Sequence, residues 1–157
     1  AFSFLSARDL DGLENLAVST IESDAELAKI FTAAGGTGHT GYWRIQWQLV
    51  DEGRAFAVCQ SHVPVYMFPE LGSDLRQNRR MIEIMANKYA YLPQKASCRL
   101  SVRPAYQDEA RQLDIARNSP VLVSSGRLVS RSGNVCEAVT AVMRSDLVTL
   151  GLDGGRS

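Results

Sequence analysis

The sequence has no net charge and no long apolar run. It has 17 Lys and Arg against 17 Asp and Glu in 157 residues, so the formal net charge at pH 7 is zero. Nucleic-acid clamps and proteins of anionic membranes need excess basic residues, which argues against both classes. No apolar run approaches the roughly 18–20 residues that span a bilayer, and no signal peptide is recognisable. We therefore expect a cytoplasmic protein without membrane contact.

Cysteine and histidine are too sparse for a disulfide framework or a metal site. Cys59, Cys98 and Cys136 are widely spaced, and each lies in an apolar or alternating stretch. This pattern predicts three reduced thiols that act as small core residues. Zinc needs four N or S ligands, or three and a water, at workable spacings, whereas His39 and His62 are isolated. We expect no metal and no cofactor.

The length predicts a single domain that covers residues 1–157, because no linker rich in Pro, Gly or Ser divides the chain. The first residue is Ala1 rather than methionine, so we expect a processed chain or a piece of a longer one. The glycine-rich tail 151–157 is expected to be frayed.

The first half of the chain predicts a helix followed by a hairpin. Ser23 and Glu26 have the spacing of a capping box, with Ser23 as the capping residue, and apolar residues follow at helical spacing. Apolar and polar residues then alternate from Trp43 to Leu49, which is typical of a half-buried strand. A turn follows at 51–54, so residues 42–63 are expected to form an antiparallel hairpin.

The second half predicts a longer helix and three further strands. An apolar stripe that begins near Ser73 and runs to Tyr89 indicates an amphipathic helix. The remaining expected elements are strands at about 96–103, 121–129 and 134–143, and a short helix at 107–113.

A weak internal repeat points to the fold class. The helix near Ala28 and the hairpin after it resemble the helix near Ala110 and the strands after it, with Gly53 and Gly133 at matching turns. Two copies of helix, strand, turn and strand predict one antiparallel sheet with flanking helices, an α+β fold with an internal pseudo-repeat.

Two short motifs suggest chemistry that their context does not support. Residues 36–41 match G-x-G-x-x-G, but this segment follows a helix and precedes a strand, the reverse of a dinucleotide site. Ser61 and His62 are neighbours on a predicted strand, so their side chains point to opposite faces and cannot form a nucleophile pair. We expect no catalytic residues.

Three polar features remain as binding candidates. The first is the stripe Arg44, Gln46 and Gln48, whose alternative is a solvated sheet face, and the second is the pair at 79–80, whose alternative is a helix surface. The third is Glu137, a carboxylate within an apolar segment, where burial is costly without a partner. A ligand amine or hydroxyl could pair with it, and so could Arg44 or Arg127 in a salt bridge.

Read in order, the segments resemble the UTRA domain, the effector-binding half of HutC-type GntR transcription regulators. The resemblance covers about residues 18–149. The segments that carry it are 24–31, like the family's opening helix; 47–58, 61–64 and 67–71, like its Asp-Gly hairpin and Phe-Pro motif; and 105–113, 119–123 and 137–146, like its second half.

The resemblance implies a chorismate lyase-like fold, a homodimer and a pocket for a small-molecule effector. It also implies an N-terminal winged-helix domain that binds operator DNA, and this domain is absent from the chain. Operator DNA is therefore expected as a partner only through that missing domain.

The resemblance also implies where an effector would bind. Two family arginines fall on Gln46 and Gln48 if one residue is inserted before Gly53, and the family's strand glutamate falls on Cys59. A serine falls near Arg80 and a late tyrosine on Met143, while Glu137 is retained. Because an amide cannot bind phosphate as a guanidinium does, we expect a ligand with an amine or hydroxyl for Glu137. Arg44 or Arg80 would take a carboxylate.

Two other functions stay open. Chorismate lyase has the implied fold and uses an arginine and a glutamate, so Arg44 and Glu137 could belong to an enzyme that releases 4-hydroxybenzoate. The other alternative is a dimerisation module without a ligand.

Overall fold

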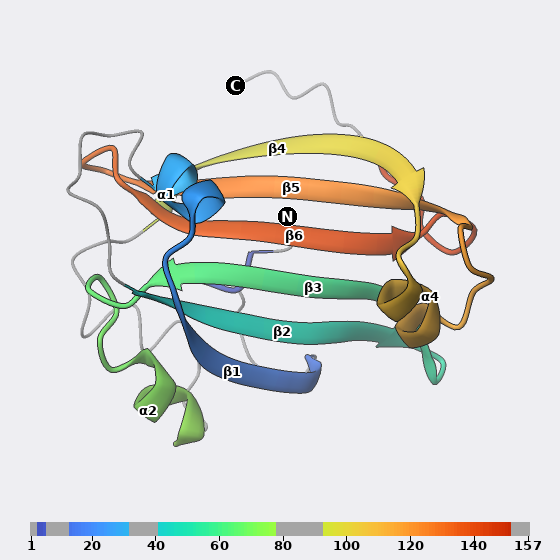
Figure 1. The fold of residues 1–157 in the computed structure, drawn as a ribbon, viewed down its shortest axis with the longest axis horizontal. Helices are drawn as coiled ribbons and strands as arrows, with labels where there is room; N and C mark the ends of the chain where they lie inside the picture. Colours follow the sequence, from blue (N-terminus) through green and yellow to red (C-terminus); the bar gives the residue numbers. More distant parts are fainter. Residues whose placement is uncertain (1–2, 6–12, 32–40, 78–92, 152–157) are drawn as a thin grey trace.

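The computed structural model describes residues 3–5, 13–31, 41–77 and 93–151. It contains one six-stranded antiparallel sheet in the order β1-β2-β3-β6-β5-β4 (Figure 1). This confirms the predicted α+β class, an antiparallel sheet with flanking helices. The elements are β1 (Glu14–Glu22), α1 (Ala25–Phe31), β2 (Gly41–Asp51), β3 (Arg54–Pro64), α2 (Leu71–Arg76), β4 (Pro93–Pro104), α4 (Gln107–Leu113), β5 (Pro120–Ser130) and β6 (Val135–Arg144).

The sheet consists of two halves with the same order of elements. β1-α1-β2-β3 forms one half and β4-α4-β5-β6 the other, and they meet where β3 pairs with β6. The turn inside each half contains a glycine with positive φ, 77° at Gly53 and 87° at Gly133. Glycine adopts this conformation without steric cost. The predicted repeat of helix, strand, turn and strand is therefore present.

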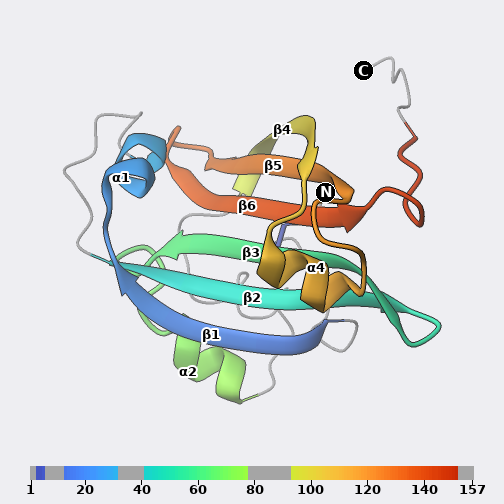
Figure 2. The ribbon, with the colours of Figure 1, turned by 45° about the vertical axis from the view of Figure 1, so that its right-hand side comes forward.

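Alternation along the strands gives the sheet two different faces. We call the face that carries Trp47, Cys59 and Glu137 the inner face, and the face that carries Arg44 and Gln60 the outer face. α1 and α4 both lie on the outer face, near opposite ends of the strands (Figures 1 and 2). α2 packs on the inner face.

The main apolar cluster lies on the inner face and joins segments that are far apart in the sequence. Phe4 and Leu5 from the N-terminal segment pack there with Phe68 and Leu71 from the region of α2. Phe4 and Trp47 contact each other with ring centroids 5.5 Å apart. Two smaller clusters lie under α1 and α4 on the outer face. The N-terminal segment is thus part of the core.

Two details of the first half differ from the sequence prediction. α1 is capped by Asp24, whose Oδ1 accepts the Leu27 N–H at 2.8 Å, so Ser23 as the capping residue was wrong by one position. β1 was not predicted because its apolar side chains are few and only half-buried, as expected of an edge strand. The hairpin was predicted correctly, and its register shifts once, between Leu49 and Val50.

Several predictions concern segments that lie partly or wholly outside the described residues, and the cysteine prediction is tested within them. α2 begins the stretch expected to be helical from Ser73 but ends at Arg76, with Gln77 as its C-cap, and the remainder of that stretch lies outside the described residues. The G-x-G-x-x-G loop, apart from Gly41, and the tail, apart from Gly151, lie outside them as well. All three cysteines are free, and Cys59 and Cys136 are buried as predicted. Cys98 is exposed, because it lies on the outermost strand, so its assignment to the core was wrong.

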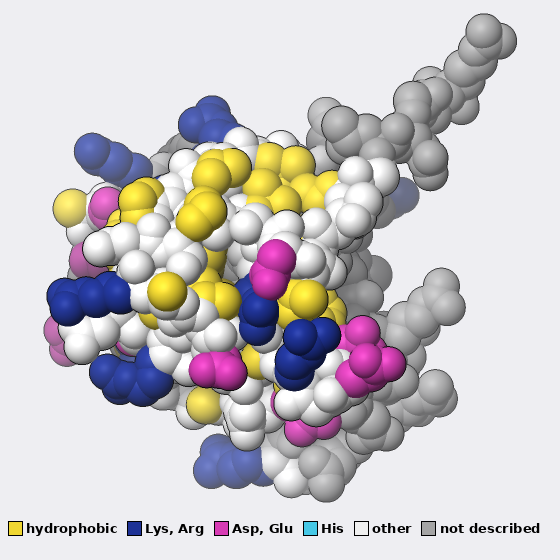
Figure 3. Space-filling model, turned by 90° about the vertical axis from the view of Figure 1, so that its right-hand side faces the viewer, with side chains coloured by type: hydrophobic (Ala, Val, Ile, Leu, Met, Phe, Trp, Pro, Cys, Tyr) yellow, Lys and Arg dark blue, Asp and Glu magenta, His cyan; other side chains and the backbone are white. Residues whose placement is uncertain are grey.

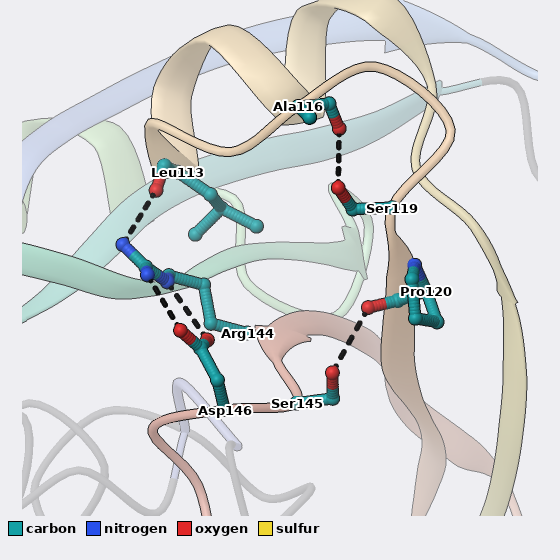
Figure 4. A network of polar contacts seen from close by, with 7 residues as sticks. All are labelled: Leu113, Ala116, Ser119, Pro120, Arg144, Ser145 and Asp146. Carbon is teal, nitrogen blue, oxygen red and sulfur yellow. Dashed lines mark hydrogen bonds and ion pairs between the residues drawn. The ribbon is translucent and has the colours of Figure 1, made fainter.

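The segment 144–146, which contributed to the family resemblance, has a structural role. Figure 4 shows the Arg144 guanidinium between α4 and the end of β6. It donates to both Asp146 carboxylate oxygens, at 3.0 and 2.7 Å, and to the Leu113 carbonyl at 3.2 Å. Arg144 therefore ties the last turn of α4 to the sheet, where helix carbonyls lack intrahelical partners.

Side chains of both charges are mixed on the end of the molecule that carries α4 (Figure 3). This agrees with a net charge of zero over the whole sequence. In the part of the chain that is described, no helix is long and apolar enough to cross a membrane.

The contact between Trp43 and α2 leaves no room for a side chain at residue 72. A Cβ at Gly72 would lie 2.8 Å from the Trp43 ring, which is held by a 2.8 Å hydrogen bond from Nε1 to the Phe68 carbonyl. We expect Gly72→Ala to lower the free energy of unfolding by about 1–3 kcal/mol, measured by urea denaturation. Gly151→Ala is the control, since a Cβ there meets no atom within 4 Å. Equal stability of the two variants would contradict this packing.

Candidate functional site

Glu137 is a fully buried carboxylate on the inner face, near the start of β6. It lies on β6 opposite Leu128 of β5, and its side chain is 0% exposed. Four donors reach its two oxygens. Ser3 Oγ donates to Oε1, while Oε2 accepts from Ser61 Oγ at 2.6 Å, Phe4 N at 2.8 Å and Leu5 N at 3.2 Å. Three of the four donors come from the N-terminal segment 3–5.

The electrostatics of Glu137 combine two opposing effects. Burial raises the pKa of the carboxyl, because the charged form loses its hydration. The hydrogen bonds from Ser3, Ser61, Leu5 and Phe4 act in the other direction and favour the carboxylate. Burial is the larger effect, so the pKa lies above its ordinary value. The donors are what allows this group to remain in the core.

The salt bridge considered for Glu137 is not the arrangement found. Arg44 and Arg127 both lie on the outer face, on the other side of the sheet. Hydroxyl and backbone donors take the place of a cation. For the same reason Arg44 and Glu137 do not share a pocket, and the resemblance to an arginine–glutamate enzyme site loses its geometric basis.

Two other predicted site residues share the inner face with Glu137 but lie farther along the sheet, since Cys59 pairs with Ala141 and Met143 is six residues beyond Glu137 on β6. Cys59 and Met143 are on the inner face, and both are buried. Burial raises the pKa of the Cys59 thiol to about 12, so this cysteine stays protonated and is not a nucleophile. Both residues belong to the main apolar cluster of the inner face.

Gln46 and Gln48 lie on the outer face, away from Glu137. The register pairs Trp47 with Cys59 and Gln46 with Gln60, so Trp47 is the β2 residue that shares the face of Cys59. Gln46, Gln48 and Cys59 nevertheless all border one cleft of about 400 Å³, and their joint role in effector binding stays a prediction. The alternation of Trp43, Ile45, Trp47 and Leu49 was the signal that assigns the faces. Arg80 lies outside the described residues.

The outer face contains a large open cleft beside α1. Its volume is about 830 Å³, and a smaller cleft of about 400 Å³ adjoins it toward α4. The two share Gln60 and Thr140, and Gln46 and Gln48 line the smaller one. The charged and titratable residues that line the larger cleft are Asp24, Glu26, Arg44, His62, Cys98, Arg99 and Arg127. The sequence contains no local signal that groups His62, Arg99 and Arg127 with Arg44, because the four residues lie on four different strands.

His62 titrates abnormally in this cleft. Burial lowers the pKa of its imidazole, and the neighbouring Arg44 lowers it further, while Asp24 has a smaller opposite effect. His62 is directly opposite Arg44 in the pairing of β2 with β3. It is therefore neutral over more of the physiological pH range than an exposed histidine.

The smaller cleft is bordered by a neutralised arginine. Arg103 binds both Glu109 carboxylate oxygens, at 2.7 and 2.8 Å, and lies over the Tyr106 ring at 4.0 Å. This pairing lowers the pKa of Glu109 and raises that of Arg103. In the segments for which the structure is described, no group of three His, Cys, Asp or Glu could hold a metal ion.

Comparison with known proteins identifies relatives of this fold. The sequence pattern of the UTRA domain matches residues 12–149. The C-terminal domain of Yurk from Bacillus subtilis superposes with a TM-score of 0.79 at 15% identity, covering 90% of this chain and 96% of that one. A GntR-family transcriptional regulator from Enterococcus faecalis V583 gives 0.74 at 12% identity, covering 87% and 96%. A search of curated proteins found no match.

The effector domain of PhnF from Mycobacterium smegmatis has the same fold. It superposes with a TM-score of 0.71 at 16% identity, covering 85% of this chain and 80% of that one. The structure of PhnF itself is covered over 57% of its length. At these identities the likeness establishes the fold, which is the predicted chorismate lyase-like one.

Two substitutions of Glu137 should separate its charge from its hydrogen bonds. Glu137→Ala leaves the amides of Phe4 and Leu5 and two hydroxyls without their acceptor, so we expect a loss of about 2–4 kcal/mol in unfolding free energy. Glu137→Gln keeps an oxygen for the three donors at Oε2 and offers its NH₂ to Ser3. It should lie within about 1 kcal/mol of the parent at pH 7. Urea denaturation measures both, and equal losses would contradict the arrangement.

The His62 environment makes stability depend on pH. Because the folded-state pKa is lowered, the unfolded chain binds more protons below about pH 6.5, and stability rises with pH through that window. Arg44, Arg127, Asp24 and Glu26 are the charges around the cleft. We expect His62→Gln to reduce the rise in unfolding free energy between about pH 5 and pH 7, followed by urea denaturation. An unchanged slope would show that His62 is not desolvated.

Proposed function

The chain belongs to the UTRA domain family, and we propose that it is the effector-sensing domain of a GntR transcription regulator of the HutC type. A regulator of this kind acts in the cytoplasm, on operator DNA. The fold supports the proposal, because the C-terminal domain of Yurk, the Enterococcus faecalis regulator and the PhnF effector domain share it. In this proposal the winged helix that binds DNA belongs to another part of the full-length protein, on the N-terminal side.

The observation that carries the proposal is the binding of Glu137 by the N-terminal segment. A buried carboxylate is held by hydrogen bonds that reach it from residues 3–5 and Ser61. An effector with an amine or hydroxyl can supply equivalent donors to the same oxygens. An effector bound at Glu137 would then compete with the N-terminal segment for the carboxylate. Its binding would displace that segment.

The coupling follows from differential affinity. An effector that binds the state with a displaced N-terminal segment shifts the population toward that state, by as much as its affinities for the two states differ. Because the segment lies on the N-terminal side of the domain, its displacement would change the position of a DNA-binding domain attached there. No catalytic step is involved, so we propose a sensor rather than an enzyme.

The residues around Glu137 indicate the kind of effector. Phe4 and Leu5, which bind Glu137, belong to an apolar cluster that also contains Ile45, Trp47, Cys59 and Met143. A phosphosugar would bring a phosphate next to these apolar residues, and no arginine of the described segments lies on the inner face beside Glu137 to bind it. We propose an effector that is mainly apolar and has an amine or hydroxyl for Glu137.

We also propose that the protein is a homodimer. β4 is an edge strand of 12 residues, and two of its apolar side chains are exposed, Leu100 by 43% and Val102 by 68%. Long edge strands with exposed apolar residues tend to pair with another chain. A second copy of the same strand is a self-complementary partner, as a two-fold interface requires.

A thermal-shift screen tests the sensor proposal. The protein is screened against amino acids, amines, polyols, sugar phosphates and chorismate. A true effector should raise Tm by several degrees at saturating concentration, and Glu137→Gln should abolish most of the shift. Glu22→Gln is the matched control, because Glu22 is exposed on β1.

The other outcomes are informative as well. A shift that is unchanged in Glu137→Gln would exclude Glu137 as the effector contact. A flat screen would favour a dimerisation module without a ligand. Release of 4-hydroxybenzoate from chorismate, followed by absorbance, would overturn the proposal in favour of an enzyme.

A further inference from the structure

Three arginines and a histidine converge on the larger cleft of the outer face. They come from four strands: Arg44 from β2, His62 from β3, Arg99 from β4 and Arg127 from β5. β2 and β3 are neighbours in the sheet, as are β5 and β4, and β6 lies between the two pairs, so the cluster exists only in the folded chain. It lies on the opposite side of the sheet from Glu137.

The strand register shows how the cations surround the cleft. Arg44 is opposite His62, and Ala138 of β6 is opposite both His62 and Arg127. The small Ala138 side chain therefore lies between two basic groups. The next outer-face residue of β6, Thr140, adds a hydroxyl to the floor. The result is a shallow floor of small side chains with basic groups on two sides.

These cations have no acidic partner in the described part of the chain. Arg103 and Arg144 each form a two-point ion pair with a carboxylate, whereas Arg44, Arg99 and Arg127 form none with any residue described. In addition, Arg44 Nε is buried and has no hydrogen-bond partner there. A buried donor without an acceptor is unfavourable, and an anion in the cleft would satisfy it.

Two carboxylates also border this cleft. Asp24 caps the start of α1, where its Oδ1 accepts a hydrogen bond from the Leu27 N–H at 2.8 Å. Glu26 is exposed on α1. Three arginines against these two acids leave a positive charge, which is concentrated over the strands rather than at the helix.

We propose that this cleft binds the anionic group, carboxylate or phosphate, of a small metabolite, with Arg44 and Arg127 as its principal ligands. The volume of about 830 Å³ is that of a small-molecule site. A guanidinium binds either oxyanion through two parallel hydrogen bonds. Ser125 and Thr140 hydroxyls line the same space for the uncharged part of the ligand. This site is separate from the proposed effector site at Glu137.

The adjoining smaller cleft does not compete for the anion. Its amides bind each other or nearby side chains: Gln46 donates to Gln60 at 3.1 Å, and Gln48 to Gln112 at 3.3 Å. Its arginine, Arg103, is neutralised by Glu109. The anion therefore belongs at the α1 end of the outer face.

Isothermal titration calorimetry with inorganic phosphate and with malonate tests the proposal at low ionic strength. Saturable binding of at least one anion is expected, and the stronger of the two identifies phosphate or carboxylate as the group recognised. Arg44→Gln and Arg127→Gln should each weaken binding about tenfold or more. Arg127 is exposed, so its replacement does not threaten folding. Arg54→Gln is the control, since Arg54 is an exposed arginine on the β2–β3 hairpin, outside the cleft.

The outcomes separate this site from the effector site. Glu137→Gln should leave anion affinity unchanged, because residue 137 lies on the inner face. The proposal is overturned if neither anion binds the parent protein saturably, or if Arg54→Gln weakens binding as much as Arg44→Gln. Loss of anion binding in Glu137→Gln would place the anion on the inner face instead.

Discussion

The hydrogen bonds to Glu137 are the constraint on which the inner face depends. A carboxylate in an apolar core is strongly unfavourable, and here four donors offset that cost. One donor, Ser61, is on the central strand β3, and the other three are in the N-terminal segment. The segment is therefore held by the three hydrogen bonds that it donates to Glu137, and Phe4 packs against Trp47 beside them. The packing of the inner face therefore depends on the position of the N-terminal segment.

The sheet separates two chemically different environments. Its inner face is mainly apolar and buries the Glu137 carboxylate, whereas its outer face carries cations without acidic partners in the described chain. Because side chains alternate along a strand, the neighbouring residues Ser61 and His62 point to opposite faces of the sheet. A ligand on one side need not affect the other directly. The two proposed sites, for an effector and for an anion, therefore lie on opposite faces of the sheet.

Much of the fold could be predicted from the sequence, because its signals are local. Alternation from Trp43 to Leu49 indicated β2, and the turn glycines Gly53 and Gly133 marked the repeated hairpins. β1 was missed, since an edge strand with half-buried side chains has a weak pattern. The site was harder to predict. Gln46 and Gln48 lie on the opposite face from Glu137 and Met143, because a family alignment gives positions along a strand and a one-residue shift exchanges the faces. The arginine cluster depends on long-range strand order, which no local pattern encodes.

Hydrogen exchange at the amides of Phe4 and Leu5 tests the central claim most directly. If Glu137 holds the N-terminal segment in the core, both amides should exchange as slowly as those of β3, with opening free energies close to that of global unfolding. In Glu137→Ala the same two amides should become fast while those of β3 remain protected. Exchange of Phe4 and Leu5 in the parent protein at the rate of an unprotected chain would contradict the account.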